Sequence, residues 1–169
     1  MKYSLSSLLL LTILSSCIST SPDTENYLVT EKKMSYEEWL VLAKHDIRLF
    51  PMYGHAVKTS KQLEADAEFV ERAIADAGSS DSASNYYFKK ACTYMKQRDL
   101  QTVMYRLNQA WLLNVKNPDV YRGFGWVYLQ LEQYDTAIKL FDKGLVIDPD
   151  NEYLLSMKTL VIRKLKKGC

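Results

Sequence analysis

Few residues in this sequence have the types and spacing that catalysis or metal binding requires. His45 and His55 are the only two histidines, and neither has partners at the intervals of a metal or catalytic site. No His-Glu-x-x-His, Cys-x-x-Cys, Gly-x-Ser-x-Gly or phosphate-binding glycine loop occurs. Glu37 and Glu38 are adjacent, so on a helix they point about 100° apart and cannot face each other as an acid–base pair. The sequence therefore predicts no catalytic residue, no metal, no cofactor and no enzymatic activity.

Cys17 is the residue whose surroundings indicate covalent chemistry. It follows a basic start at residues 1–3 and a nearly unbroken apolar run at residues 8–14, which is too short to span a bilayer. This arrangement predicts a signal peptide over residues 1–16 rather than a transmembrane helix. Residues 14–17 read Leu-Ser-Ser-Cys, which resembles the lipobox of bacterial lipoproteins. The resemblance implies cleavage before Cys17 and acylation of that cysteine; the alternative is an ordinary signal peptide that contains a cysteine.

The lipoprotein interpretation also predicts a location. Acyl chains contribute about 0.8 kcal/mol per buried methylene group, which gives durable attachment to the lipid bilayer of a bacterial cell envelope. Ile18 stands where an Asp marks inner-membrane retention in enterobacteria, so the periplasmic face of the outer membrane is favoured over the inner membrane. Residues 17–34 then comprise the acylated cysteine and a polar, flexible tether.

A separate pattern organises the second half of the sequence, where residues of similar type recur with a period of 34. The pairs at this offset are Ala91 and Gly125, Tyr94 and Tyr128, Leu100 and Tyr134, Leu107 and Phe141, and Ala110 and Gly144. Small, aromatic and apolar residues in a fixed order at this period are typical of a two-helix repeat. We therefore expect an all-α fold of antiparallel helix pairs, with units at residues 84–117 and 118–151.

These units resemble tetratricopeptide repeats. The second unit carries residues typical of the family at Tyr121, Phe124, Gly125, Tyr128, Tyr134, Ala137, Phe141 and Pro149, with Gly144 in place of the usual alanine. The first unit is degenerate, because Lys90, Val103 and Val115 replace a large apolar residue, a small residue and a proline. The small residues predict that the two helices of a unit approach each other closely.

Two further helical regions flank the repeats. Ser35 and Glu38 form a predicted capping box, Pro51 ends the first helix, and Gly78 ends the second. Residues 35–83 are therefore expected to form a helical pair followed by a loop. Residues 152–169 are expected to form a capping helix, whose basic end either complements the helix dipole or contacts anionic lipid.

In tetratricopeptide proteins the first helix of each unit lines a concave groove that binds a peptide or a partner helix. Carried onto this sequence, the resemblance implies a partner-binding groove made of Phe88, Met95, Arg122, Trp126, Leu129 and Gln130. Aromatic residues beside an arginine are typical of an interface hot spot. Phe88 and Cys92 stand where the family's carboxylate clamp begins, which argues against such a clamp. Two alternatives stay open: the N-terminal pair fills the groove with Trp39 and Leu40, or the repeat register differs.

Charge and composition limit the partners. The 22 Lys and Arg residues nearly balance the 20 Asp and Glu residues, so the whole molecule has no electrostatic drive toward nucleic acid. A hydrophobic fraction of 47% is that of an ordinary globular protein. Cys92 and Cys169 could form a disulfide in an oxidising compartment, or Cys92 could be a small buried apolar residue.

Together these patterns predict a membrane-anchored scaffold or assembly factor that binds a protein or peptide partner in the cell envelope. One alternative is an immunity or inhibitor lipoprotein that binds one specific enzyme. Another is a protein that binds a small ligand, such as a cell-wall fragment, under the N-terminal pair.

Overall fold

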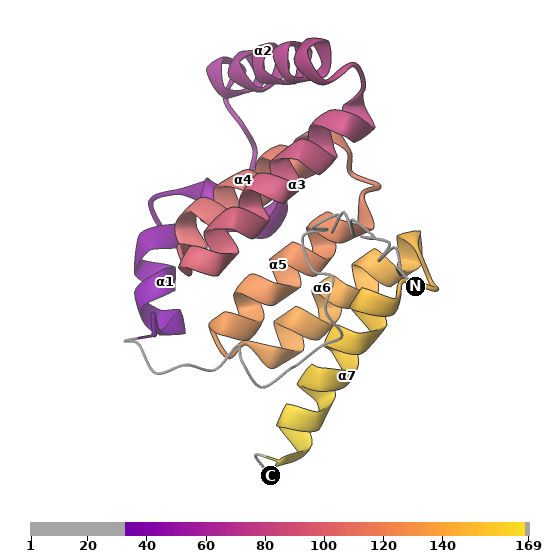
Figure 1. Cartoon of the computed structure of the whole chain (residues 1–169). Helices are drawn as coiled ribbons and strands as arrows, with labels where there is room; N and C mark the ends of the chain where they lie inside the picture. The colour runs from indigo at the N-terminus through magenta and orange to yellow at the C-terminus, as the bar shows by residue number, and fades with distance from the viewer. Residues whose placement is uncertain (1–32, 168–169) are drawn as a thin grey trace, which may run out of the picture.

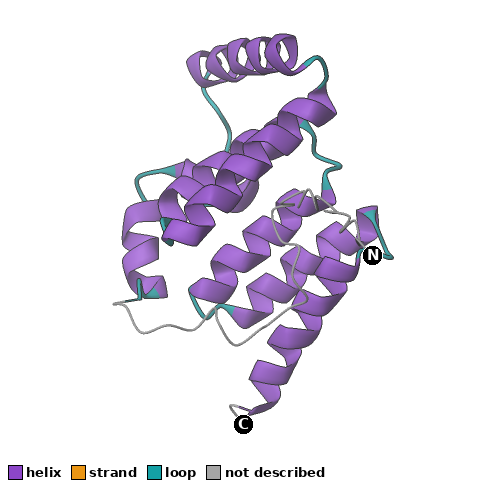
Figure 2. Ribbon diagram, viewed as in Figure 1, coloured by secondary structure: helices purple, strands orange, loops and turns teal. Residues whose placement is uncertain are grey.

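The computed structural model describes residues 33–167, and within them the protein is all-α (Figure 1). The elements in chain order are α1 (Tyr36–Ala43), two short 3-10 helices η1 (Ile47–Leu49) and η2 (Pro51–His55), α2 (Ser60–Ala77), α3 (Ser80–Gln97), α4 (Leu100–Leu113), α5 (Pro118–Gln130), α6 (Tyr134–Ile147) and α7 (Glu152–Lys167). No β-strand occurs among these residues (Figure 2), so the predicted fold class is confirmed. The predicted signal peptide, Cys17, nearly all of the tether and Cys169 lie outside the described residues.

Helices α3 to α7 pack as successive hairpins. Helix α3 pairs with α4, α5 pairs with α6, and α7 packs against both α6 and α5. Each hairpin turns at a non-glycine residue with positive φ, Arg98 in the first and Glu132 in the second, again 34 residues apart. Helix α3 begins at Ser80, about one turn before the unit start that the repeat period suggests. Across residues 33–167, no helix combines the length and the hydrophobicity that crossing a bilayer requires.

Local sequence signals account for several helix ends. The Glu38 amide donates to the Ser35 hydroxyl at 3.1 Å, and the Ser35 amide donates to the Glu38 carboxylate at 2.9 Å, which is the predicted capping box. Gly78 ends α2 in a left-handed conformation with a φ of 80°, which glycine adopts without steric cost. Pro118 occupies the first position of α5, where a missing amide hydrogen costs nothing.

Small residues set the spacing between the paired helices. Three glycines each meet a large side chain of a neighbouring helix: Gly123 meets Leu107, Gly125 meets Phe141, and Gly144 meets Leu154. A Cβ at Gly125 would overlap the Phe141 ring, and Phe141 is itself fully buried. The close approach that the sequence predicted for this unit is therefore present. One continuous hydrophobic core joins α1 and the η1–η2 segment to α3 through α7, and a separate small cluster around Ala73, Ala83 and Leu113 packs α2 against α3 and α4.

The N-terminal helices do not form the predicted pair. Figure 1 shows α1 and α2 at opposite ends of α3, and α2 packs instead on α3 and α4. The segment between them, which contains η1 and η2, contacts α4. Consecutive left-handed residues from Met52 to His55, with φ values between 54° and 63°, give this segment its sharp turn. The apolar spacing of the two helices indicated that each buries one face, but not against which neighbour.

Asn108 of α4 fixes the segment in place. Its side-chain amide donates to the carbonyls of Arg48 at 2.8 Å and Phe50 at 2.9 Å, while its oxygen accepts the Tyr53 amide at 3.3 Å. Asn108 is fully buried, so these backbone groups would lose their partners without it, at roughly 1–3 kcal/mol for each unsatisfied group. Three hydrogen bonds from one side chain therefore offset the backbone strain of the left-handed turn, which costs about 1–2 kcal/mol for each non-glycine residue.

We expect Gly125→Ala to destabilise the protein by about 1–3 kcal/mol, because the added methyl group overpacks the α5–α6 interface against Phe141. This cost opposes the gain of about 1 kcal/mol that alanine brings to a helix interior. Urea unfolding of the wild type, Gly125→Ala, Phe141→Leu and the double variant measures the coupling. The added methyl should cost less beside the smaller leucine. An unchanged or raised unfolding midpoint for Gly125→Ala would refute the close approach.

Candidate protein-interaction surface

The first helices of successive hairpins, α3, α5 and α7, contact one another in sequence and present one side of the stack. We call this side the first-helix face. Its members on α3 and α5 occupy equivalent positions of the 34-residue period: Asn85, Phe88, Cys92, Met95 and Lys96 on α3, and Asp119, Arg122, Trp126, Leu129 and Gln130 on α5. The six residues predicted as the groove are all in this set.

The apolar members of the face serve the core. Phe88, Trp126 and Leu129 are only 5%, 8% and 8% exposed and belong to the continuous core cluster. Met95 is half-buried and packs against the same cluster. These side chains therefore form part of the hydrophobic core as well as of the first-helix face. That the six residues bind a partner stays a prediction.

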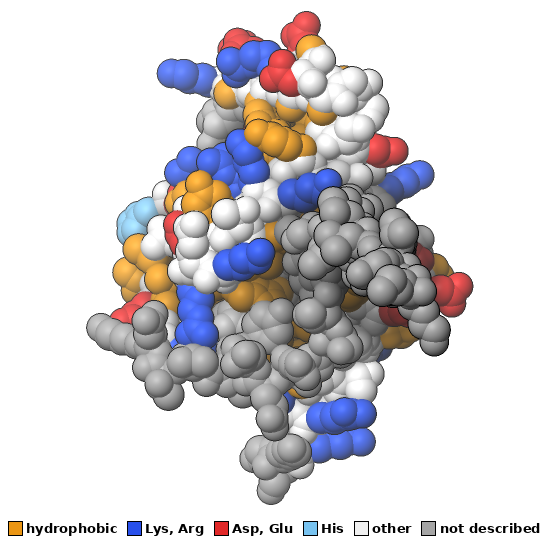
Figure 3. All heavy atoms as spheres, viewed as in Figure 1, with side chains coloured by type: hydrophobic (Ala, Val, Ile, Leu, Met, Phe, Trp, Pro, Cys, Tyr) orange, Lys and Arg blue, Asp and Glu red, His pale blue; other side chains and the backbone are white. Residues whose placement is uncertain are grey.

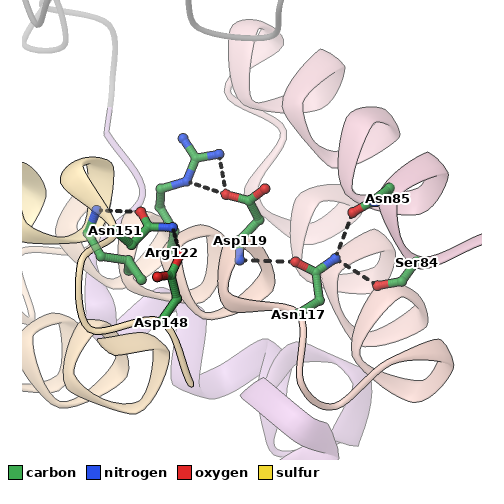
Figure 4. A network of polar contacts seen from close by, with 8 residues as sticks. Ser84, Asn85, Asn117, Asp119, Arg122, Asp148 and Asn151 are labelled. Carbon is green, nitrogen blue, oxygen red and sulfur yellow. Dashed lines mark hydrogen bonds and ion pairs between the residues drawn. The ribbon is translucent and has the colours of Figure 1, made fainter. Parts of the chain in front are cut away.

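Arg122 links three consecutive first helices. Its guanidinium carbon lies 5.1 Å from the ring centroid of Phe88 on α3 and 5.0 Å from that of Tyr153 on α7. Its Nε and Nη2 donate to Oδ1 of Asp119 at 3.1 and 2.8 Å (Figure 4). The side chain is only 12% exposed. Sequence reasoning found Arg122 but missed Tyr153, although Tyr153 follows Asp119 by one period of 34.

Asparagines at the junctions between units orient the first helices (Figure 4). The Asn117 side-chain amide donates to Ser84 Oγ at 2.9 Å and to Asn85 Oδ1 at 3.0 Å, and its oxygen accepts the Asp119 amide at 3.1 Å. Asn151, one period later, accepts the Leu154 amide at 3.1 Å and so caps α7. Sequence reasoning missed both asparagines, whose 34-residue offset was the available signal.

The accessible residues of the first-helix face on α3 and α5 are polar. Asn85 and Lys96 are exposed, Asp119 keeps 37% of its side-chain area exposed, and Gln130 is half-buried. A partner that reaches this face would therefore meet amides and charges at its edges. Among residues 33–167 no group of three His, Cys, Asp or Glu side chains could hold a metal ion.

The segment at residues 46–55 docks on α4, which is the second helix of the first hairpin. Asp46 accepts hydrogen bonds from Arg48 and, at 2.9 Å, from the Tyr105 hydroxyl of α4, and the Arg48 hydrogen bonds lower the pKa of the Asp46 carboxyl. Tyr53 packs edge-on against Trp111 of α4, and burial raises its pKa to about 12. These contacts place the segment on α4 rather than on the first-helix face.

The two residues that were expected to fill the groove lie in different environments. Trp39 is fully buried in the core, whereas Leu40 is 40% exposed and plugs nothing. Helix α1 reaches the stack through Tyr36, whose ring lies 6.3 Å from that of Tyr128 on α5, and Lys33 pairs with Glu132 at the α5–α6 turn. Adjacent positions of a helix face different sides, which explains why two neighbouring apolar residues have different environments.

Comparison with known protein families gives a match, which covers part of the stack. Residues 94–161, from the C-terminal part of α3 to α7, match the family model of the tetratricopeptide repeat. No curated protein and no solved structure matches the chain. Tetratricopeptide repeats generally mediate the binding of protein partners.

We expect Arg122→Ala to lower the free energy of unfolding by roughly 1–3 kcal/mol, because it removes a largely buried cation from two aromatic rings. Arg122→Lys should recover only part of this, since an ammonium group lacks the planar stacking surface. Asp119→Asn is the matched control and should cost less than about 1 kcal/mol, because Asp119 is partly exposed. Thermal unfolding of the three variants gives this order. A loss for Asp119→Asn as large as that for Arg122→Ala, with little loss for Arg122→Lys, would mean that the ion pair and not the stacking dominates.

Proposed function

We propose that this protein is a non-enzymatic interaction scaffold that binds a protein partner on its first-helix face while it is held at a membrane surface. The observation that carries the proposal is the tetratricopeptide match over residues 94–161, which covers the last turn of α3, helices α4 to α6 and most of α7. A stack of this kind presents a rigid surface, so a partner can bind without ordering the scaffold first.

The character of the face supports a polar mode of recognition. Its large apolar side chains are enclosed in the core, and its accessible edges carry Asn85, Lys96 and the partly exposed Asp119. The exposed cation Lys89 lies on the same helix as Lys96. Charges at the edge of an interface steer encounter and fix orientation more than they add affinity. We infer a partner that offers carboxylates to the α3 edge and hydrogen-bonding groups to α5.

The membrane part of the proposal depends on Cys17. An apolar run followed by Leu-Ser-Ser-Cys supports lipidation at this residue, with the folded part connected through residues 18–34. The proposed location is the bacterial cell envelope, and the periplasmic face of the outer membrane is favoured. Anchoring would confine the scaffold to a surface and raise its effective concentration toward partners in the same membrane.

Charge reversal on the face tests the binding site. We expect Lys96→Glu to reduce capture of the partner in cross-linked native envelopes by about tenfold, the change that 1.4 kcal/mol of binding free energy produces. Lys139→Glu on α6 is the matched control, because it makes the same change at an exposed lysine outside the first-helix face. Both variants should have the same melting temperature as the wild type. Equal capture by Lys96→Glu and the wild type would place binding elsewhere on the molecule.

Replacement of the predicted lipidation site tests the anchor. Cys17→Ser should abolish acylation and leave an uncleaved or soluble product, since only the cysteine thiol can receive the lipid. Metabolic labelling with a fatty acid and detergent phase partitioning measure this directly. Unchanged labelling and partitioning would refute the lipobox interpretation and leave the scaffold function of the folded part unaffected.

A further inference from the structure

Helix α2 resembles the second helix of a hairpin whose first helix is not found among residues 33–167. It precedes α3 by two residues and packs on α3 and α4, while α1 lies at the other end of α3 (Figure 1). Ala73 is the one residue of α2 that is fully enclosed, and the half-buried residues beside it lie in the C-terminal half of the helix. The N-terminal half is open: Leu63 is 56% exposed and Ala67 is also exposed.

Helix α7 resembles the first helix of a hairpin. Leu155, Thr159, Arg163 and Lys166 are exposed at intervals of three or four residues and so form one stripe along it, with Leu155 at 44%. Thr159 stands one period after Gly125, the position that receives Phe141 of α6 in the preceding hairpin. Within the described residues no second helix covers this stripe.

The two open faces carry opposite charge. Helix α2 has five acidic and two basic residues, whereas α7 has one acidic and five basic residues. Glu64, Glu68 and Glu71 are exposed on α2 at helical spacing beside the Leu63–Ala67 edge, and none has an ion-pair partner among residues 33–167. In Figure 3 Lys and Arg side chains gather on the projecting end of α7.

We propose that α7 of one copy of this chain pairs with α2 of the next copy and so completes a helix hairpin across the contact. Helices of a hairpin run antiparallel, which sets the N-terminal half of α2 against the C-terminal half of α7. Glu64 and Glu68 then face Arg163 and Lys166, and Leu63 lies near the half-buried Ile162. Opposite charges across such a contact select this orientation and disfavour α2–α2 or α7–α7 pairing.

The contact uses different surfaces on the two copies, so it is heterologous and leaves one open end on each side. Copies can therefore add in a row, with the first-helix faces repeated along it. Neither α2 nor the outer stripe of α7 overlaps the α3 and α5 residues of the first-helix face, so this association is independent of the partner binding proposed above.

Charge-swapped copies of the full chain test the pairing. Two differently tagged copies are mixed in detergent and treated with a carbodiimide, which joins a carboxylate to an amine in direct contact. We expect the wild type to give linked dimers and longer species, with α2 peptides joined to α7 peptides. Glu64→Lys with Glu68→Lys, and separately Arg163→Glu with Lys166→Glu, should each reduce linkage about tenfold, since each places like charges opposite each other.

The decisive sample is an equal mixture of the two reversed variants. It should restore dimers and longer linked species, because each variant then finds the opposite charge on the other. The longer species are the decisive readout, since variants with a misfolded α2 or α7 could link only through their unaltered ends and would stop at dimers. Lys139→Glu is the control and should link as the wild type does. Absence of wild-type linkage, failure of the mixture to recover, or links outside α2 and α7 would overturn the proposal. So would loss of linkage from the α7 variant alone, accompanied by loss of its binding to anionic vesicles, which would assign the basic end to lipid.

Discussion

The close approach of neighbouring helices at three glycines is the constraint on which the rest of this structure depends. Gly123, Gly125 and Gly144 are helical, so they are present to make room rather than to permit an unusual backbone conformation. A large side chain of an adjacent helix fills each space and becomes part of one continuous core. Because this packing brings α5 against α4 and α6, and α6 against α7, the first helices fall on one side of the stack.

A second constraint holds the segment between α1 and α2 on α4, on the other side of the stack from the first-helix face. Asn108 uses both side-chain N–H donors and its oxygen on backbone groups of residues 48–53, and it is fully buried, so an unmet group there would be costly. The docked segment can therefore adopt a left-handed turn that an isolated chain would avoid. Since the segment is held on α4, the first-helix face is shaped by α3, α5 and α7.

The first-helix face and the two ends of the stack differ in the chemistry of their exposed residues. On the first-helix face, apolar side chains are used for stability, and Arg122 is largely committed to Phe88, Tyr153 and Asp119. The proposed recognition of a partner there would use the polar groups along the edges. The ends of the stack are different, since α2 and α7 keep exposed apolar residues within strongly charged surroundings. These differences underlie the two proposals, which are partner binding on the first-helix face and pairing of copies through the two ends.

The sequence by itself determined the features that depend on neighbours in the chain or on the repeat. The 34-residue period, the small residues and the Ser35 and Gly78 caps predicted an all-α stack of paired helices and its close approach, because backbone geometry and side-chain size act locally. Only the tertiary structure decided which faces meet. Phe88 and Trp126 are apolar whether they line a groove or fill a core, and no spacing rule separates the two. Helix α2 could bury its stripe against α1 or against α3, and in the structure it packs on α3 and α4. The alternative arrangements differ little in the free energy gained by burying apolar surface. They also depend on contacts between segments that are far apart in the sequence, so one arrangement is selected only when the whole chain packs.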